Sequence, residues 1–401
     1  MGGQAGNAVE KAAALRAGGD VTGAIRLLRQ AIKGAAQPAP LHNALGLILE
    51  DDNQMKAAIT QYRRALSLTP ASSEFANNLG NALQASGDLK GSIDAYRNAV
   101  TLAPASPEAH TNLGDALRQA KQLKDAQSAL NEALRIAPDF VTARYQLAVL
   151  MVEEARYDDA LEEVDASLAI SPYAPDVLAL RVVLLEALGK SDDARQLFDV
   201  ERFLLAEVLE PPSGFDTIRR FNRELEKHVL ERSRLTPDPF GASTRGGRHS
   251  DDLFAGVGAV RDGLRQIVQG TVSNYVAKLT SNGDHPFLQH RPRDVRLVAQ
   301  ANVLDRDGYL IAHVHPQAWL SGAYYVRLPS EIRDGDPANA GWLRFGGAVE
   351  GIRLDAARSA FHYVKPVEGM LVLFPSFFVH GTVPLSAKRH RLSLGVDVVA
   401  G

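Results

Sequence analysis

The sequence of 401 residues contains no cysteine, and this absence excludes several chemistries together. A chain without thiols has no disulfide scaffold, no thiolate zinc site, no iron–sulfur cluster and no cysteine nucleophile. Any transition metal must therefore be bound by His, Asp or Glu side chains. Because 45% of the residues are hydrophobic and 23% are charged, the chain can bury a large core, and its length is typical of two or three domains.

Long apolar segments and a strong net charge are also missing. No uninterrupted apolar run approaches the roughly 20 residues that span a bilayer. The first residues, MGGQAG, show neither the basic and then apolar pattern of a signal peptide nor the Ser or Thr that myristoylation requires. A formal net charge of -3 provides no overall positive field for phosphates. We therefore expect a cytoplasmic protein whose partners include neither a membrane nor a nucleic acid.

The first half of the sequence is a repeat with a period of 34 residues, which continues to about residue 205. The recurring prolines are Pro70, Pro104, Pro138 and Pro172. The recurring small residues are Ala24, Ala58, Ser92, Ala126, Ala160 and Ala194, and Leu-Gly pairs begin at Leu45, Leu79 and Leu113. Apolar residues within each unit fall at helical spacing, and Asp/Gly clusters separate the units. Each unit is therefore predicted to be a pair of antiparallel helices.

This pattern resembles the tetratricopeptide repeat family, with about six helix pairs in residues 1–205. Small residues let the two helices approach closely, and the proline ends one unit before the next begins. The resemblance implies a curved superhelix whose groove binds a protein or peptide partner. Polar candidates for that groove are Asn43, Asn77, Asn78, Asn81 and Asn112.

The pattern changes after about residue 205. We predict a helical connector over residues 206–295, which includes a helix from Phe215 to Arg234 and a Pro/Gly/Ser/Arg-rich candidate linker from Thr236 to Asp251. In residues 296–401 short apolar segments alternate with turn residues, and no helical pattern separates them. The predicted strands are 295–303, 320–328, 361–364, 370–374 and 391–399, and the predicted turns are 305–308 and 334–339. The fold class is therefore a multidomain α + β protein, in which a double-stranded β-helix (jelly roll) with flanking helices follows the helical repeats.

Three histidines on or beside these strands are candidate metal ligands. His313 and His315 are two residues apart, so a strand would place both rings on one face, roughly 7 Å apart along the chain. His380 follows an apolar strand 65 residues after His315. Imidazole suits iron, zinc, copper and nickel, so this spacing leaves the metal open.

A cation follows the third histidine. Arg391 begins the last predicted strand and shares a face with Ser393. A guanidinium inside a barrel needs a partner, and beside a hydroxyl it is suited to hold a carboxylate at two points. The alternative is that Arg391 belongs to the exposed basic run from Lys388 to His390, but its place in the strand weighs against this. A second Arg/His-rich stretch, Ser243 to His249, is either an anion-binding segment or a solvated loop.

Taken together, these motifs resemble the Fe(II)/2-oxoglutarate-dependent oxygenases, and more narrowly a bacterial branch that is often joined to tetratricopeptide repeats. The resemblance covers about residues 210–400. The motifs that carry it are HVHP from His313, WLSGAYYV from Trp319, FPS from Phe374 with His380, and the pair Arg391 and Ser393.

The resemblance implies roles for individual residues. His313 and His380 would bind Fe(II), and Arg391 with Ser393 would hold the distal carboxylate of the cosubstrate 2-oxoglutarate. Tyr325 would donate to the same carboxylate, by similarity to prolyl hydroxylases. The metal would keep positions open for the 2-oxo acid and for O2. Candidates for substrate contacts, or for contacts to the metal ligands, are Asn302, Gln317, Trp319 and Trp342.

One departure from the family pattern concerns the third ligand. His315 occupies the place where these enzymes usually have Asp or Glu. Three interpretations stay open: His315 is the third ligand, the iron uses two histidines and water, or a carboxylate such as Asp305, Asp307 or Glu350 completes the site. We favour the first.

These observations give three hypotheses of function. The first is an Fe(II)- and 2-oxoglutarate-dependent dioxygenase, a hydroxylase, that acts on a protein or peptide recruited by the repeats. The second is a non-catalytic scaffold with an oxygenase-like domain, for which the missing carboxylate is the motive. The third is a cupin-type metalloenzyme with three His ligands that does not use 2-oxoglutarate. Binding of 2-oxoglutarate through Arg391 separates the first from the third, and turnover separates the first from the second. The sequence makes no prediction of the oligomeric state.

Overall fold

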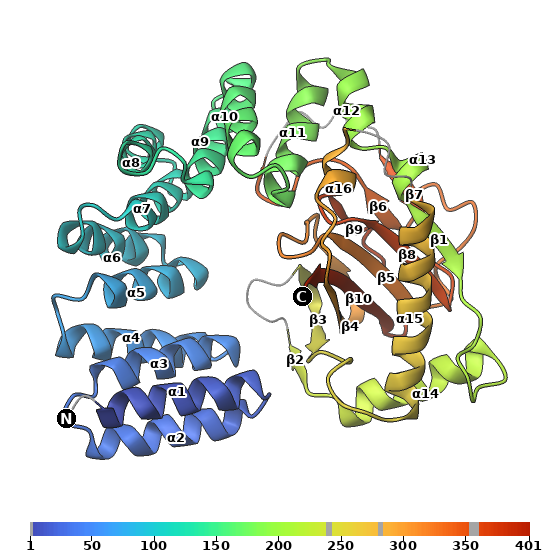
Figure 1. Ribbon diagram of the computed structural model, residues 1–401, viewed down its shortest axis with the longest axis horizontal. Helices are drawn as coiled ribbons and strands as arrows, with labels where there is room; N and C mark the ends of the chain where they lie inside the picture. Colours follow the sequence, from blue (N-terminus) through green and yellow to red (C-terminus); the bar gives the residue numbers. More distant parts are fainter. Residues whose placement is uncertain (1–2, 238–242, 280–283, 353–360) are drawn as a thin grey trace. The chain divides into compact units, whose positions relative to one another are not determined.

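The chain divides into two compact units, Met1–Leu150 and Met151–Gly401 (Figure 1). The computed structural model describes residues 3–237, 243–279, 284–352 and 361–401. Part of the candidate linker, residues 238–242, lies outside the described residues. None of the helices in the described ranges combines the length and apolarity needed to cross a bilayer.

Helix pairs build the first unit, as the repeat predicts. The helices are α1 (Gly3–Ala17), α2 (Val21–Gly34), α3 (Ala39–Asp51), α4 (Met55–Leu68), α5 (Ser73–Ala85), α6 (Leu89–Leu102), α7 (Pro107–Gln119), α8 (Leu123–Ile136) and α9 (Val141–Glu153). Side chains before the helices cap them: Ser72 accepts from the Phe75 N–H and Ser106 from the Ala109 N–H.

The recurring Leu-Gly pairs have a packing explanation. A Cβ on Gly46 would lie 2.5 Å from the ring of Tyr62, and one on Gly80 would lie equally close to Tyr96. Both rings are fully buried between the paired helices. Each repeat therefore needs a residue without a side chain where the large residue of the second helix crosses the first.

The asparagines of the repeats form bonds between neighbouring units. Asn78 Nδ2 donates to Asn43 Oδ1 over 3.0 Å, and Asn112 Nδ2 donates to Asn77 Oδ1 over 2.9 Å. Asn43 is buried, whereas Asn81 is exposed. These amides therefore tie α3, α5 and α7 together.

The second unit begins with the last helices of the repeat and continues into helices of different lengths. They are α10 (Tyr157–Ile170), α11 (Pro175–Ala187), α12 (Ser191–Leu197), α13 (Val200–Phe203), α14 (Ile218–Arg232), α15 (Ala259–Lys278) and α16 (Pro286–Gln289). Leu178, Val182 and Leu197 from α11 and α12 share one core with the strands that follow. The compact units thus divide at Leu150, while the sequence places a boundary at residue 205; the division of the chain into 1–205, 206–295 and 296–401 stays a proposal.

Two antiparallel sheets form the rest of the second unit. The strands are β1 (Leu205–Val208), β2 (Leu235–Pro237), β3 (Thr244–Ser250), β4 (Val295–Leu310), β5 (Leu320–Arg327), β6 (Leu343–Phe345), β7 (His362–Val364), β8 (Met370–Pro375), β9 (His380–Thr382) and β10 (Arg391–Ala400). The seven-stranded sheet has the order β1-β8-β5-β10-β4-β3-β2, and the three-stranded sheet has the order β7-β6-β9. After β4 the chain passes repeatedly between the two sheets.

Each predicted strand is present, but one predicted turn is not. Asp305–Gly308 lies inside β4, where the pairing with β3 passes from Leu304↔Gly247 to Tyr309↔Arg245. The strand therefore carries a bulge at this point and continues beyond it.

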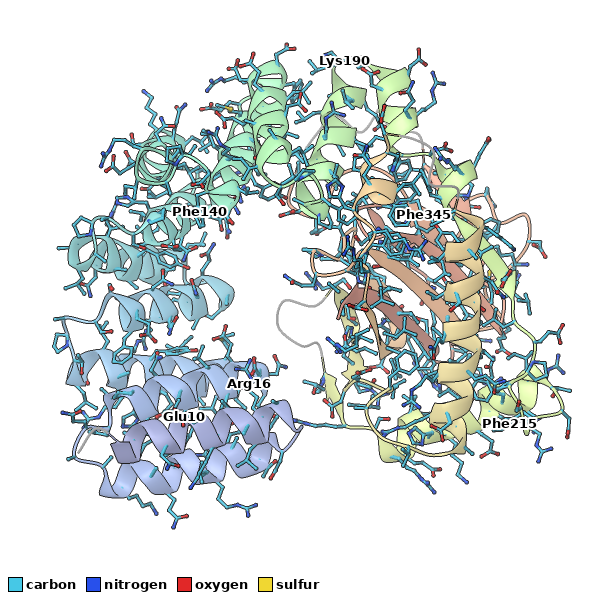
Figure 2. The ribbon with its side chains drawn as sticks, viewed as in Figure 1. Glu10, Arg16, Phe140, Lys190, Phe215 and Phe345 are labelled. Carbon is cyan, nitrogen blue, oxygen red and sulfur yellow. The ribbon has the colours of Figure 1, made fainter. Side chains whose placement is uncertain are left out.

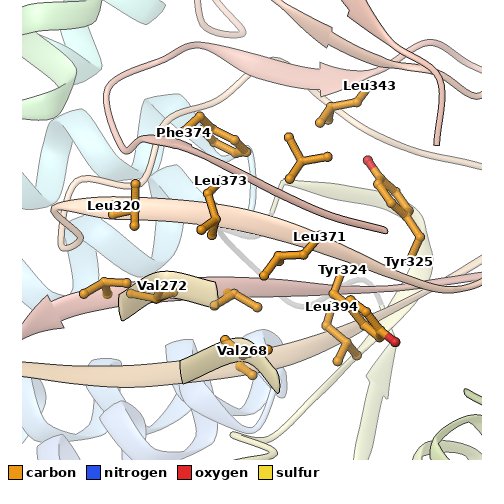
Figure 3. Close-up of a cluster of buried hydrophobic side chains, with 14 of the residues drawn as sticks. Val268, Val272, Leu320, Tyr324, Tyr325, Leu343, Leu371, Leu373, Phe374 and Leu394 are labelled. Carbon is orange, nitrogen blue, oxygen red and sulfur yellow. The ribbon is translucent and has the colours of Figure 1, made fainter. Parts of the chain in front are cut away.

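The seven-stranded sheet has two different faces. On one face Tyr324, Leu371 and Leu394 pack with Val268 and Val272 of α15 (Figure 3). Figure 1 shows α15 lying across the sheet. Because side chains alternate along a strand, the residues between these apolar positions face the opposite side, toward the three-stranded sheet. Tyr324 and Tyr325, for example, point away from each other (Figure 3).

Candidate metal centre

Three histidines converge between the two sheets. The backbones of His313 and His380 pair, with His313 N–H donating over 2.9 Å to the carbonyl of His380 and His380 N–H donating back over 3.0 Å. His315 follows on extended backbone, where its N–H donates to the carbonyl of Ser376. One ring nitrogen from each histidine lies within 4.8 Å of the other two. The structure thus brings together the three residues that the sequence singled out, although His313 and His315 lie beyond the end of β4.

The hydrogen bonds around the rings define which nitrogen faces the centre. Nδ1 of His313 lies 2.8 Å from the carbonyl of Ile311, and Nδ1 of His380 lies 2.9 Å from the carbonyl of Phe378. A carbonyl only accepts, so each Nδ1 carries the proton and each Nε2 has a free lone pair. Nε2 of His315 and Nε2 of His380 are 3.3 Å apart. The arrangement presents converging nitrogen lone pairs, which suit a cation.

Burial keeps the rings of His313 and His380 neutral. Burial, and next the neighbouring His315, lower the pKa of His313 to about 3. Burial, followed by repulsion from the other two rings, holds the pKa of His380 well below its ordinary value. Phe374 and Phe345 lie against His380, with ring centroids 4.5 Å and 6.1 Å away, and Phe345 is labelled in Figure 2. Neutral imidazoles are the form that binds metals.

A carboxylate supports the third histidine. Asp397 of β10 has Oδ1 2.8 Å and Oδ2 3.0 Å from Nδ1 of His315, and it also accepts a hydrogen bond from Ser321. Burial alone would raise the pKa of Asp397, but His315 and the Ser321 hydroxyl outweigh it and hold this pKa below its ordinary value. Sequence reasoning missed Asp397. The signal was present, because the two-residue step from Arg391 to Ser393 reaches Asp397 on the same face of the strand.

Helix α11 packs against the residues that precede His313 and His380. Ala179 packs with Ala312 and Val379, the residues directly before His313 and His380. Near this contact the Tyr173 hydroxyl donates over 2.7 Å to the carbonyl of Trp319. The last repeat helices thus belong to the frame that positions the ligands.

A polar cavity of about 70 Å³ extends from the histidines. Arg391, Ser393, Tyr325 and Asn302 line it, and all four are buried. Nη1 of Arg391 donates over 2.8 Å to the carbonyl of Gly341, and the guanidinium lies 5.2 Å from the centroid of the Tyr325 ring. Within the described residues, Nε of Arg391 and the hydroxyl of Tyr325 are buried without a hydrogen-bond partner. Burial lowers the pKa of Arg391 and raises that of Tyr325.

Other candidates lie elsewhere. Gln317 is exposed and outside the lining of the cavity. Trp319 stacks on Phe287 with ring centroids 4.4 Å apart, and its indole N–H donates to the Phe287 carbonyl. Trp342 also lies outside the lining, and its indole nitrogen is buried without a partner in the described part of the chain.

The three carboxylates proposed as a third ligand are not at the centre either. Asp305 and Asp307 line a separate surface groove, and Glu350 is exposed. Further residues that line the cavity include Ser243, His249 and Gln300. The solvated loop expected over Ser243–His249 is wrong, because Thr244–His249 belong to strand β3.

Comparison with protein families finds matches in both halves of the chain. Residues 300–397 match the family described as "Putative 2OG-Fe(II) oxygenase", and residues 9–73, 80–120 and 117–169 match tetratricopeptide repeat families. The chain thus joins tetratricopeptide repeats to a segment that matches this oxygenase family. The match to the oxygenase family includes all three histidines, Tyr325, Arg391, Ser393 and Asp397.

Solved structures similar to the chain include pilF from Pseudomonas aeruginosa, with 21% identity and a TM-score of 0.44 over 50% of this chain and 91% of that one. PilW, a type IV pilus biogenesis factor, has 21% identity and a TM-score of 0.45 over 49% of this chain and 92% of its own. A tetratricopeptide repeat protein from Parabacteroides merdae has 18% identity and a TM-score of 0.44 over 57% and 87%. No curated protein matches the chain.

Proposed function

We propose that this protein is an Fe(II)- and 2-oxoglutarate-dependent dioxygenase, a hydroxylase whose substrate is a protein or peptide recruited by the repeats. His313, His315 and His380 would hold Fe(II), and Arg391, Ser393 and Tyr325 would hold the distal carboxylate of 2-oxoglutarate. The family match over residues 300–397 supports the oxygenase class. The passage of the chain between two antiparallel sheets supports a double-stranded β-helix.

The observation that carries the proposal is the pair of buried atoms without partners. Nε of Arg391 and the hydroxyl of Tyr325 both face one cavity, in which the three histidines also lie. A buried donor without a partner is costly, and a buried cation is costlier still. An anionic ligand with two carboxylate oxygens would satisfy both groups. 2-Oxoglutarate has such a carboxylate at the end opposite its chelating 2-oxo acid group.

The donor set fits Fe(II) as well. Three imidazoles replace the common arrangement of two histidines and one carboxylate. Asp397 provides the negative charge one step further out, through its contacts with Nδ1 of His315. Such an outer carboxylate fixes the orientation of the ring and makes its Nε2 a stronger donor.

The residues of the chain then divide the work of the site. The chemistry that Fe(II) and 2-oxoglutarate supply when bound is the activation of O2, so that a substrate C–H becomes C–OH while the cosubstrate is converted to succinate and CO2. Arg391 neutralises the far carboxylate, and its bond to the Gly341 carbonyl fixes the guanidinium. Phe345 and Phe374 shield the side of His380 from water. The backbone pairing of His313 with His380 holds two ligands at a fixed separation.

A second candidate rests on the donor set alone. A cupin-type metalloenzyme would use the same three histidines, and among the described residues no carboxylate joins the metal-binding cluster. Such an enzyme has no need of the Arg391 and Tyr325 pair, and for this reason we place it second.

Anaerobic titration tests the proposal. Apoprotein is titrated with Fe(II) and then with 2-oxoglutarate, and the visible charge-transfer band of a chelated 2-oxo acid is followed. We expect the band in the wild type, its loss in His380→Ala, and its weakening in Arg391→Ala. Arg327→Ala is the matched control, because Arg327 pairs with Glu226 instead of lining the cavity. Iron binding without a band would favour the cupin-type enzyme, and no metal binding would favour a scaffold.

A further inference from the structure

Three segments that are distant in the sequence meet at one surface groove, and each contributes at least one Arg or Lys. They are the Arg/His-rich stretch of β3, the bulge of β4, and the basic run before β10. The groove has a volume of about 830 Å³. Its cationic lining residues are Arg245, Arg248, Arg306, Lys388 and Arg389, and we call this feature the basic groove.

The backbone of the groove is closely built. A Cβ on Gly308 would lie 2.3 Å from the carbonyl oxygen of Gly246, so only glycine allows the bulge to press against β3. Gly246 has a φ of 65°, in the region that favours glycine. The Ala387 N–H donates over 2.9 Å to the Arg306 carbonyl, which joins the bulge to the basic run. Bulges of this kind are commonly found beside functional sites, where they direct side chains.

The charge of the groove is opposite to that of the chain. Five Arg or Lys side chains and two aspartates line it, so its formal charge is five minus two, or +3, against -3 for the whole sequence. Arg306, Lys388 and Arg389 are exposed. Asp305 lies 3.5 Å from Arg248, a distance too long for a strong ion pair between exposed groups. The groove therefore attracts anions although the chain as a whole is acidic.

The groove adjoins the cavity of the metal centre. Tyr309 lines the groove and Leu310 lines the cavity, and likewise His390 lines the groove and Arg391 the cavity. Residues that are adjacent in the chain thus line both the groove and the cavity. A chain segment bound in the groove would lie beside the walls that hold 2-oxoglutarate.

We propose that the basic groove binds an acidic segment of the protein substrate. That the bound protein is the substrate rests on the proposed function. A peptide fits better than a nucleic acid for two reasons. The phosphates of a nucleic acid are part of its backbone and cannot turn away from the two aspartates of the lining, whereas glutamate carboxylates lie at the ends of side chains that can. Tyr309 and His390 are the aromatic rings among the lining residues, so the groove has no longer series of rings on which successive bases would stack.

Fluorescence anisotropy of the metal-free full chain tests this proposal. The probes are labelled octaglutamate, octaglutamine and octalysine peptides and a labelled single-stranded oligothymidine. We expect octaglutamate to bind, and we expect its affinity to fall as salt is added. In the double variant Arg306→Glu/Arg389→Glu its affinity should fall by at least about tenfold. The matched control is Arg26→Glu/Arg29→Glu, which reverses the same number of charges on α2 and should leave binding unchanged.

The outcomes separate this inference from the proposed function. Equal loss in both double variants, or equal binding of octaglutamine, would overturn the groove as an acidic-peptide site. Tighter binding of oligothymidine that is lost in the groove variant would assign the surface to nucleic acid instead. Because no metal is needed, these results do not depend on the charge-transfer band. The band in the groove variant should match that of the wild type, since neither substituted residue lines the cavity.

Discussion

Nδ1 of His315 lies within 3.0 Å of both carboxylate oxygens of Asp397. This contact places a negative charge behind the histidine that stands where the oxygenase pattern has a carboxylate ligand. The carboxylate thus contacts the outer nitrogen of His315 and does not join the three converging ring nitrogens. Its contact with Nδ1 leaves Nε2 free to face the other two rings. Ser321 on the neighbouring strand donates over 2.7 Å to Oδ1, the oxygen of Asp397 that lies nearer to Nδ1 of His315.

Replacement of Asp397 should weaken metal binding. In Asp397→Asn the amide no longer provides the charge, and it can donate to Nδ1 and so favour the wrong tautomer of His315. We expect the affinity for Fe(II) or Co(II) to fall by about 10- to 100-fold, measured by anaerobic competition with a chelator. Asp305→Asn is the control, because Asp305 lies in the basic groove. If Asp305→Asn weakened metal binding and Asp397→Asn did not, the outer role of Asp397 would be wrong.

Removal of the Tyr325 hydroxyl should weaken cosubstrate binding without changing the stability of the fold. Tyr325→Phe loses the buried hydroxyl that has no partner within the described residues, so we expect about tenfold weaker 2-oxoglutarate binding and unchanged melting. Tyr324→Phe is its neighbour on the opposite face, where the hydroxyl donates over 2.6 Å to Asn222. That variant should keep cosubstrate affinity but lose about 1 kcal/mol or more of stability. Titration of the charge-transfer band and thermal unfolding measure the two effects, and the reverse pattern would contradict the assignment.

The repeats could be predicted from sequence because their determinants are local. Gly46 and Tyr62 are 16 residues apart, and the same contact recurs between Gly80 and Tyr96. The contact between the glycine and the large residue therefore lies within a single repeat, and its recurrence appears in the sequence as a period of 34 residues. Strands β4 and β10 were visible because apolar residues alternate along them, whereas β5 and β8 were visible as short, mostly apolar segments that are buried on both faces.

Elements that depend on tertiary contacts were harder to predict. Strand β3 has the sequence TRGGRHS, which carries no apolar alternation, and it is a strand because β4 pairs with it. Asp305–Gly308 has turn residues, yet tertiary pairing on both sides continues the strand past the bulge. Trp319 lies just before β5, and its ring turns to Phe287 of a short helix that the sequence did not place. The three histidines that converge could be singled out in the sequence because imidazole carries its own chemistry, and their role as metal ligands stays a prediction.

The last repeat helices should unfold with the oxygenase domain. Leu178→Ala removes a buried side chain from the core shared by α11 and the strands, so we expect a loss of about 2–5 kcal/mol in the second unit. Both tryptophans of the sequence, Trp319 and Trp342, lie in that unit, and their fluorescence reports on it alone. Leu130→Ala is the matched change in the first unit, where Leu130 is fully buried. It should alter the circular dichroism transition but not the fluorescence transition in urea, and an identical response of both variants would contradict the division at Leu150.

The stability of the second unit should fall in mild acid through His285. Its Nε2 lies 3.0 Å from the carbonyl of Leu197, and its Nδ1 accepts from the Phe287 N–H over 3.2 Å, so a second proton would leave two donors facing each other. Burial accordingly lowers the pKa of His285 below its ordinary value.

The direction of this pH dependence follows from proton binding in the folded and unfolded states. The unfolded chain binds a proton at His285 at higher pH than the folded chain does, so this contribution is complete above the unfolded pKa of about 6.5 and is lost as pH falls below it. His285→Asn keeps an acceptor for the Phe287 N–H but does not titrate. We expect the fluorescence-detected unfolding free energy of this variant to depend less steeply on pH between about 6.5 and 5, by up to about 1.4 kcal/mol per pH unit. His290→Asn is the control, because His290 is exposed and bonds only within its own turn through Nδ1. Equal slopes for the wild type and His285→Asn would show that folding does not lower the pKa of His285.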